Sequence, residues 1–260
     1  MSVFEFNPAS TVNLVKNWNS EVALGNIAGV TSMLKFGRNP DVDTGTEDVW
    51  DGGGIWTDPT GSSLIKIQST STNDSTGGSG AQTITVKGLS SANLLSSETV
   101  TMTGTTQLTT TNSYSMVHRM FVRSAGSSGF NIGNITALNP SDTTAVLAQI
   151  TAQQNQTLMA IFKIPADKTG LMTSYYANAH KDAGGAAASG MTAVLVAKPD
   201  GEVYQIKHTG GFGAGVQSSG GHNFQPYNSF SALTTLKIRA TSNADNITVS
   251  GGFDLELHDN

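Results

Sequence analysis

The sequence predicts an all-β protein, an antiparallel β-sandwich of jelly-roll type. The first reason is composition: 13% of the 260 residues are charged, 37% are hydrophobic, and the balance is rich in Gly, Ser, Thr and Asn. Such a mixture favours strands and turns over helical bundles. The second reason is the alternation of apolar and polar residues in many short runs. The third is that no exact repeat recurs at a fixed period, which argues against propellers and solenoids.

Residues 1–58 are expected to form an extended arm and a docking segment. Apolar residues over 22–34 fit helical and extended spacing equally poorly. The following stretch, 36–59, combines two tryptophans, three consecutive glycines and several acids. A buried tryptophan removes about 150–250 Å² from water, so we expect Trp18, Arg38, Trp50 and Trp56 to dock on a neighbouring subunit. The alternative is a surface loop anchored by two aromatic residues.

Residues 59–260 are expected to form the sandwich. Alternating runs around 64–67, 83–87 and 99–102 are separated by turn-rich segments and predict antiparallel hairpins. Further strands are expected at 114–124, 143–150 and 158–164. The last of these is nearly all apolar, ends at Pro165, and should be buried on both faces. Two lobes divided near residue 165 are the alternative to one sandwich.

The last third of the chain repeats this pattern. A Pro-Asp-Gly turn within 191–208 predicts a hairpin. Residues 234–241 place Leu236, Ile238 and Ala240 on one face, with Lys237 and Arg239 on the other. Alternation over 253–258 predicts a final strand. The glycine-rich segments between 209 and 230 are expected to be loops at one end of the sandwich.

The acidic residues of the docking segment are weak candidates for a metal site. Asp41, Asp43 and Glu47, with Asp48 beside them, could present carboxylates to a hard cation such as calcium. Their spacing does not match a twelve-residue calcium loop. A hydrogen-bonded turn network, with Arg38 pairing one of the acids, is therefore the expected arrangement.

No pattern in the sequence predicts catalysis or a cofactor. The chain has no cysteine, and its five histidines are scattered without metal-ligand spacing. There is no GxSxG motif, and GFGAG at 211–215 lacks the lysine of a phosphate loop. We therefore expect a protein that is not an enzyme.

Charge and hydropathy limit the partners. A formal net charge of −5 without a basic cluster argues against nucleic acid. No window approaches the ~18 apolar residues of a membrane span, and the amino terminus lacks a signal-peptide pattern. Neither a nucleic acid nor a membrane is therefore expected as a partner.

Several passages from about residue 34 onward form a distinctive pattern. They read GRNPDVDTGTEDVWDGGG, SSLIKIQSTSTNDSTGGSGAQTITVKGL, SETVTMTGTT, RSAGSSGFNIGNIT and SGGFDLELHDN. Together they resemble virion structural proteins of tailed bacteriophages, of the capsid cement or decoration type. The resemblance implies a component of the virion, made in the host cytoplasm. Such a protein would bind and stabilise the outer surface of the head shell as a homotrimer, with the major capsid protein as its partner.

A tail-associated or fibre protein that binds a host surface glycan is the alternative. It would present the segments between 209 and 230 outward, and aromatic residues such as Tyr175, Tyr176 and Tyr227 could form a sugar platform.

Overall fold

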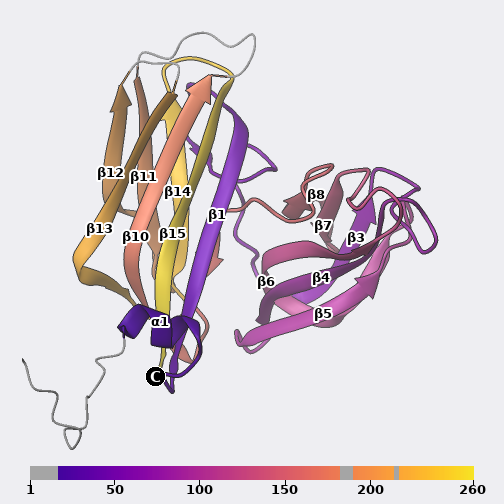
Figure 1. Cartoon of the computed structure of the whole chain (residues 1–260), viewed down its shortest axis with the longest axis horizontal. Coiled ribbons are helices and arrows are strands. Elements are labelled where there is room, and N and C mark those ends of the chain that lie inside the picture. The colour runs from indigo at the N-terminus through magenta and orange to yellow at the C-terminus, as the bar shows by residue number, and fades with distance from the viewer. Residues whose placement is uncertain (1–16, 182–189, 214–216) are drawn as a thin grey trace, which may run out of the picture.

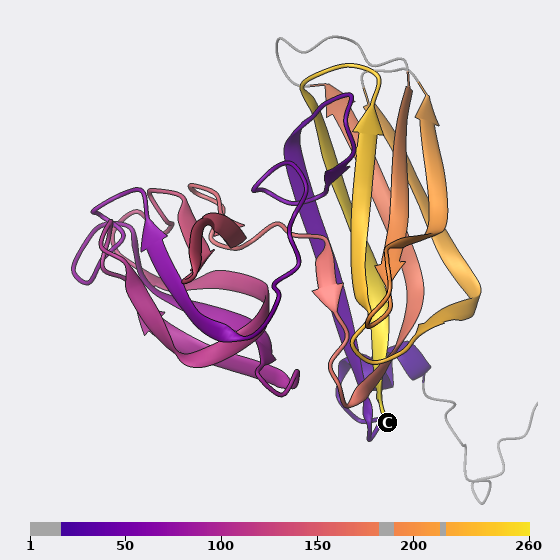
Figure 2. The ribbon, with the colours of Figure 1, turned by 180° about the vertical axis from the view of Figure 1, so that it is seen from behind.

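The computed structural model describes residues 17–181, 190–213 and 217–260 and shows two β-lobes side by side (Figure 1). The larger lobe, here the jelly-roll lobe, is built from residues 17–58 and 158–260. The smaller, here the inserted lobe, is built from residues 59–157 and is a single curled sheet (Figure 2). All paired strands are antiparallel, and the predicted all-β fold class is confirmed.

The described residues of the jelly-roll lobe form one short helix and nine strands. The helix α1 (Trp18–Ala23) is capped by the side chain of Asn17, which accepts from the Ser20 amide. The strands are β1 (Val30–Val42), β2 (Glu47–Asp48), β9 (Ile161–Lys163), β10 (Lys168–Lys181), β11 (Gly190–Lys198), β12 (Gln205–Gly213), β13 (Gln217–Phe230), β14 (Thr235–Ser242) and β15 (Ile247–Asp259). The short strand β9 pairs with β14. Within the described residues, no helix is long and apolar enough to span a bilayer.

The strand order of this lobe is that of a jelly roll. One sheet has the order β1-β15-β10-β13, and the facing sheet has the order β2-β14-β11-β12, with β9 beside β14. Without β9, this lobe has eight strands, which can be numbered 1 to 8 along the chain. In these numbers the first sheet has the order 1-8-3-6 and the second sheet has the order 2-7-4-5. Two interleaved Greek keys produce this order. Apolar residues of both sheets, among them Phe162, Leu195 and Phe253, fill the space between them.

The inserted lobe lies between the second and third strands of the jelly roll. Its strands are β3 (Ser63–Ser69), β4 (Ala81–Ser90), β5 (Leu95–Thr101), β6 (Leu108–Ala125), β7 (Ile135–Asn139) and β8 (Asp142–Ile150), in the order β5-β4-β6-β3-β7-β8. The concave side encloses a separate apolar core that includes Ile65, Val86 and Met120. The predicted strands at 114–124 and 143–150 are parts of β6 and β8.

The chain passes between the lobes twice, over 49–62 and 151–160, whereas the two-lobe alternative drawn from the sequence had a single division near residue 165. The two crossings run side by side, with a bridge between Trp50 and Met159. The apolar strand expected at 158–164 is buried on both faces because it lies between the two cores. Ile161 belongs to the core of the inserted lobe, while Phe162 belongs to the core of the jelly roll.

Two segments differ in form from what their composition suggests. Residues 30–42, assigned by sequence to an arm, form β1, which pairs along its length with β15. The expectation of loops over 209–230 is wrong for the described residues, which lie in β12 and β13. Both are edge strands. Their backbone hydrogen bonds to the neighbouring strand do not depend on which side chains they carry. A Cβ at Gly221 would lie 3.3 Å from the Tyr175 carbonyl oxygen, a close approach that suits glycine.

Candidate functional site

Two of the three predicted docking tryptophans are inside the protein's own core. Trp50 and Trp56 are 5% and 1% exposed and belong to the apolar core of the inserted lobe. The indole of Trp56 donates to the Leu147 carbonyl at 2.9 Å. The ring of Trp50 covers Gly52 so closely that a Cβ there would lie 2.2 Å from it, which explains a glycine at this position.

Trp18, by contrast, is 46% exposed at the start of α1. Its indole donates to Glu256 Oε1 at 2.8 Å, on the outer face of the β1-β15-β10-β13 sheet. It is the one member of the predicted docking set that is accessible as a large aromatic side chain. The part of the docking prediction that covers residues 1–16 lies outside the described residues.

Arg38, the fourth predicted docking residue, forms an ion pair with Asp51, Nε to Oδ1 at 3.3 Å. Burial of Asp51 raises the pKa of its carboxyl, and the charge of Arg38 partly opposes that shift. The pair therefore stabilises the first crossing between the lobes rather than presenting a free cation.

The acids proposed as weak metal ligands take part in a turn network. Glu47 accepts from the Asn39 side chain at 2.8 Å, from the Gly54 amide at 2.9 Å and from the Asp43 amide at 3.2 Å. Asp43 in turn accepts from the Asn246 amide. In the part of the chain that the structure describes, no group of three or more His, Asp or Glu side chains is arranged to hold a metal ion.

A buried charged cluster, here the hinge cluster, fixes the first crossing to the jelly roll. It consists of Asp48, Asp58, Lys198, Tyr204, Lys237 and Arg239. Lys237, 1% exposed, donates from Nζ to Asp48 Oδ2 at 3.1 Å and to the Trp56 carbonyl at 2.8 Å. Arg239 binds the other Asp48 oxygen at 3.0 Å. Asp48 is thus shared by two cations.

The aromatic rings around the hinge cluster complete it. The Lys237 ammonium lies 4.8 Å from the Trp56 ring centroid and 4.6 Å from that of Tyr204. The Tyr204 hydroxyl donates to Asp58, which also pairs with Lys198 at 3.0 Å. Burial lowers the pKa of Lys237, although Asp48 and Asp58 oppose the shift. Every charge of the hinge cluster has an opposite charge beside it.

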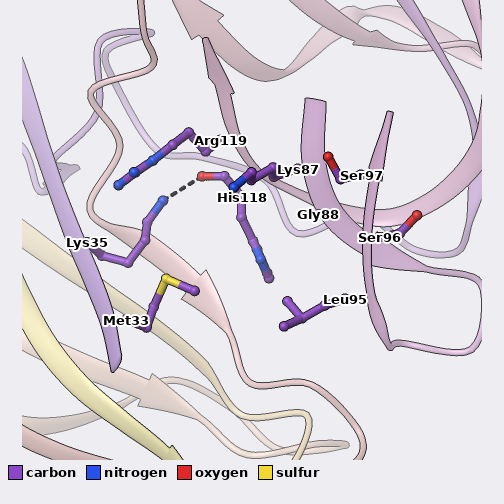
Figure 3. A pocket seen from close by; sticks show the side chains of 9 residues that line it. All are labelled: Met33, Lys35, Lys87, Gly88, Leu95, Ser96, Ser97, His118 and Arg119. Carbon is purple, nitrogen blue, oxygen red and sulfur yellow. Dashed lines mark hydrogen bonds between the residues drawn. The ribbon is translucent and has the colours of Figure 1, made fainter. Parts of the chain in front are cut away.

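A second charged site, here the interlobe pocket, lies where β1 faces β4, β5 and β6 (Figure 3). Its volume is about 320 Å³, and its lining residues are Met33, Lys35, Lys87, Gly88, Leu95, Ser96, Ser97, His118 and Arg119. Lys35 donates across the lobes to the His118 carbonyl. Arg119 donates in the opposite direction, from Nη2 to the Leu34 carbonyl at 3.1 Å, and its guanidinium stacks over Phe36.

The interlobe pocket carries positive groups for which the described residues provide no counter-ion. Lys35 is 2% exposed, and no carboxylate lines the pocket. Burial and repulsion by Arg119 lower the pKa of Lys35 well below its usual value. The pKa of His118 is also well below its usual value, because it is buried and lies near Lys35. Its Nε2 has no hydrogen-bond partner.

Sequence reasoning missed the interlobe pocket because its groups come from separate segments, each with an ordinary strand pattern. It also missed an aromatic cluster at the edges of β12 and β13. There the rings of His208 and His222 stack with centroids 4.3 Å apart, and Tyr175 bonds His208 Nδ1 at 2.6 Å. Neither pairing has a local signature, since the partners lie in different strands.

Comparison with known proteins finds only distant structural likeness. No family model matches the sequence, and no curated protein matches it. Among solved structures, a likeness is found to chains from infectious bursal disease virus, strains Gx and Gt, each at 10% identity over 88% of this chain and 76% of the other. The TM-scores are 0.20 and 0.19. At such scores the overall arrangements differ, so this likeness adds nothing to the strand order.

Proposed function

We propose that the protein is a non-enzymatic structural component of a virus particle. The observation that carries this proposal is the jelly-roll strand order of the larger lobe. Eight-stranded jelly rolls recur in viral capsid proteins, and also in lectins and cupins. The sequence resemblance to virion proteins of tailed bacteriophages favours the first of these classes. Because fold alone does not define function, the proposal needs a test on the particle itself.

Within that class, we propose a cement or decoration protein on the outer surface of the head shell. The major capsid protein would be its partner, and it would act as a homotrimer. The low fraction of charged residues supports self-association, since copies with few charges repel each other weakly. A two-lobed body with internally docked crossings could contact more than one shell subunit.

The docking surface proposed here differs from the arm expected from sequence. Trp50, Trp56 and Arg38 are engaged within the chain, which leaves Trp18 on the outer sheet face as the aromatic docking candidate. Deletion of residues 1–58 would remove β1 and both core tryptophans. We expect it to unfold the protein, so it is not a clean test of docking.

Binding to shells that lack the protein is the appropriate experiment. Purified protein should co-sediment with such shells and raise their temperature of disruption. Trp18→Ala should weaken binding by about tenfold or more if Trp18 is a hot spot. Ile206→Ala, at an exposed apolar position on β12, is the matched control and should bind normally.

The outcomes separate two claims. Failure of the wild-type protein to bind shells would contradict the cement function. Normal binding of Trp18→Ala would contradict only the role of Trp18. Of the aromatic residues considered for glycan binding, Tyr175, Phe224 and Phe230 are buried and Tyr227 is 43% exposed. One exposed ring on a strand does not form a sugar platform, so the glycan-binding alternative gains little support.

A further inference from the structure

We propose that the interlobe pocket binds a small oxyanion, of phosphate or carboxylate type, from solution. The proposal is independent of the virion function. It rests on the charges that line the pocket, on donors that have no partner, and on the size of the cavity.

The charges come from strands of both lobes and have one sign. Lys35 lies on β1, Lys87 on β4 and Arg119 on β6. Among the ion pairs formed by the described residues, none involves Lys35, Lys87 or Arg119. A buried ammonium without a counter-ion is costly, and an anion placed beside it would remove that cost.

Hydrogen-bond donors in the pocket exceed the acceptors. An ammonium has three N–H groups, and within residues 17–181, 190–213 and 217–260 the Lys35 ammonium donates one hydrogen bond, to the His118 carbonyl. The ring of buried His118 points into the space between Met33 and Leu95 (Figure 3), but its lowered pKa leaves the ring neutral, so we do not count His118 among the donors. Ser96 and Ser97 line the opposite wall. Such a set of donors matches the acceptor oxygens of phosphate or carboxylate.

The geometry of Arg119 indicates that the pocket is organised in advance. Its guanidinium is fixed by the bond to the Leu34 carbonyl and by stacking on Phe36, 5.3 Å from the ring centroid. A side chain already ordered loses little further entropy when a ligand binds. Lys87, exposed at the mouth and placed over Phe121, would attract the anion without being buried by it.

The cavity limits the size of the ligand. A volume of about 320 Å³ is at the lower end of the range for small-molecule sites. Met33 and Leu95 provide an apolar wall that could accommodate a short carbon chain next to the charged group. An anion held between Lys35 and Arg119 would contact both lobes at once and reduce their relative motion.

Calorimetric titration tests the proposal on the full-length protein. Sodium phosphate and sodium succinate are added separately, with ionic strength kept constant by sodium chloride. The wild-type protein should bind at least one of them and show a higher melting temperature in its presence. Lys35→Met should bind at least about tenfold more weakly. Lys181→Met, the same change at an exposed end of β10, should bind like the wild type.

Each result has a defined meaning. Binding of phosphate alone, succinate alone or both identifies the source of the oxyanion and supports the site if Lys35→Met loses it. The proposal is overturned if the wild type binds neither anion, or if Lys35→Met binds as tightly as the wild type. Should Lys35→Met fail to fold, Arg119→Gln provides the same comparison from the other lobe.

Discussion

Lys237 and Lys35 are both almost fully buried, yet their surroundings are opposite. Lys237 has Asp48 beside it, a carbonyl to donate to, and two aromatic rings around its ammonium. Lys35 has one carbonyl and a neighbouring Arg119, with no carboxylate in its pocket. Both lysines lie where the lobes meet. The comparison shows that burial of a lysine does not by itself reveal its role, whereas the presence or absence of an opposite charge does.

This difference separates a structural site from a binding site. The hinge cluster is complete, so removing any buried member should cost stability. The interlobe pocket is incomplete, so removing Lys35 should cost little stability and affect only ligand binding. Four predictions test this contrast, beginning with the largest expected effect.

Asp48→Asn should lower the free energy of unfolding by about 3–5 kcal/mol, because it leaves Lys237 buried without its partner. Asn keeps the shape of the side chain, so the loss reports charge and hydrogen bonding. Chemical denaturation followed by tryptophan fluorescence measures it. A loss below about 1 kcal/mol would mean that the hinge cluster is not the close ion pair described here.

Lys237→Met and Lys35→Met should change the free energy of unfolding by different amounts. The difference tests directly whether Lys237 is structural and Lys35 is not. Lys237→Met should cost about 1–3 kcal/mol, since it leaves one oxygen of Asp48 and the Trp56 carbonyl without a donor. Lys35→Met should cost less, about 0–1 kcal/mol, because removal of an uncompensated buried charge offsets the loss of its bond to the His118 carbonyl. Equal losses in the two variants would contradict the distinction.

Acidification should destabilise the wild-type protein through His118. The pKa of His118 in the folded protein is well below 6.5, its usual value in an unfolded chain. Below pH 6.5 the unfolded chain therefore binds a proton at His118 that the folded protein does not bind. The free energy of unfolding therefore decreases as the pH is lowered below 6.5, and His118 contributes at most about 1.4 kcal/mol per pH unit to this decrease.

Unfolding free energies at pH 7 and pH 5 check this prediction, with His118→Gln as the comparison. His208, whose pKa is also lowered by burial and by His222, contributes in the same direction in both proteins. The pH dependence of His118→Gln should therefore be smaller but not zero. An unchanged pH dependence would show that His118 is protonated in the folded protein.

The smallest effect is expected at the solvent-facing edge of the hinge cluster. Lys198 and Asp58 are paired at 3.0 Å, but both side chains are partly exposed. Lys198→Met should therefore change the free energy of unfolding by about 0–1 kcal/mol. A loss as large as that of Asp48→Asn would show that the cluster acts as one unit rather than through Asp48.

The parts of the fold that the sequence predicted are those with local causes. The hairpin of β11 and β12 follows from a Pro-Asp-Gly turn, in which Gly201 adopts a φ of +74°. Alternation in β15 places Phe253, Leu255 and Leu257 in the core. In β14 the separation of faces was also predicted, with Leu236 and Ile238 inward.

The parts that the sequence did not predict depend on distant pairing. Val30 pairs with His258 across almost the whole chain, so β1 was not distinguishable from an arm. The alternating pattern of β14 predicts that Lys237 faces solvent. It is buried because Trp56 and Tyr204, from separate segments, cover that face. Lys35 is hidden in the same way by β6 of the inserted lobe.

The number of copies of this protein per particle tests the central functional claim most directly. Quantitative mass spectrometry of purified particles gives the molar ratio of this chain to the major shell subunit. A structural protein that covers the head should be present at a ratio near parity. A few copies per particle would contradict the cement role and favour a tail location, and absence from the particle would contradict a virion function altogether.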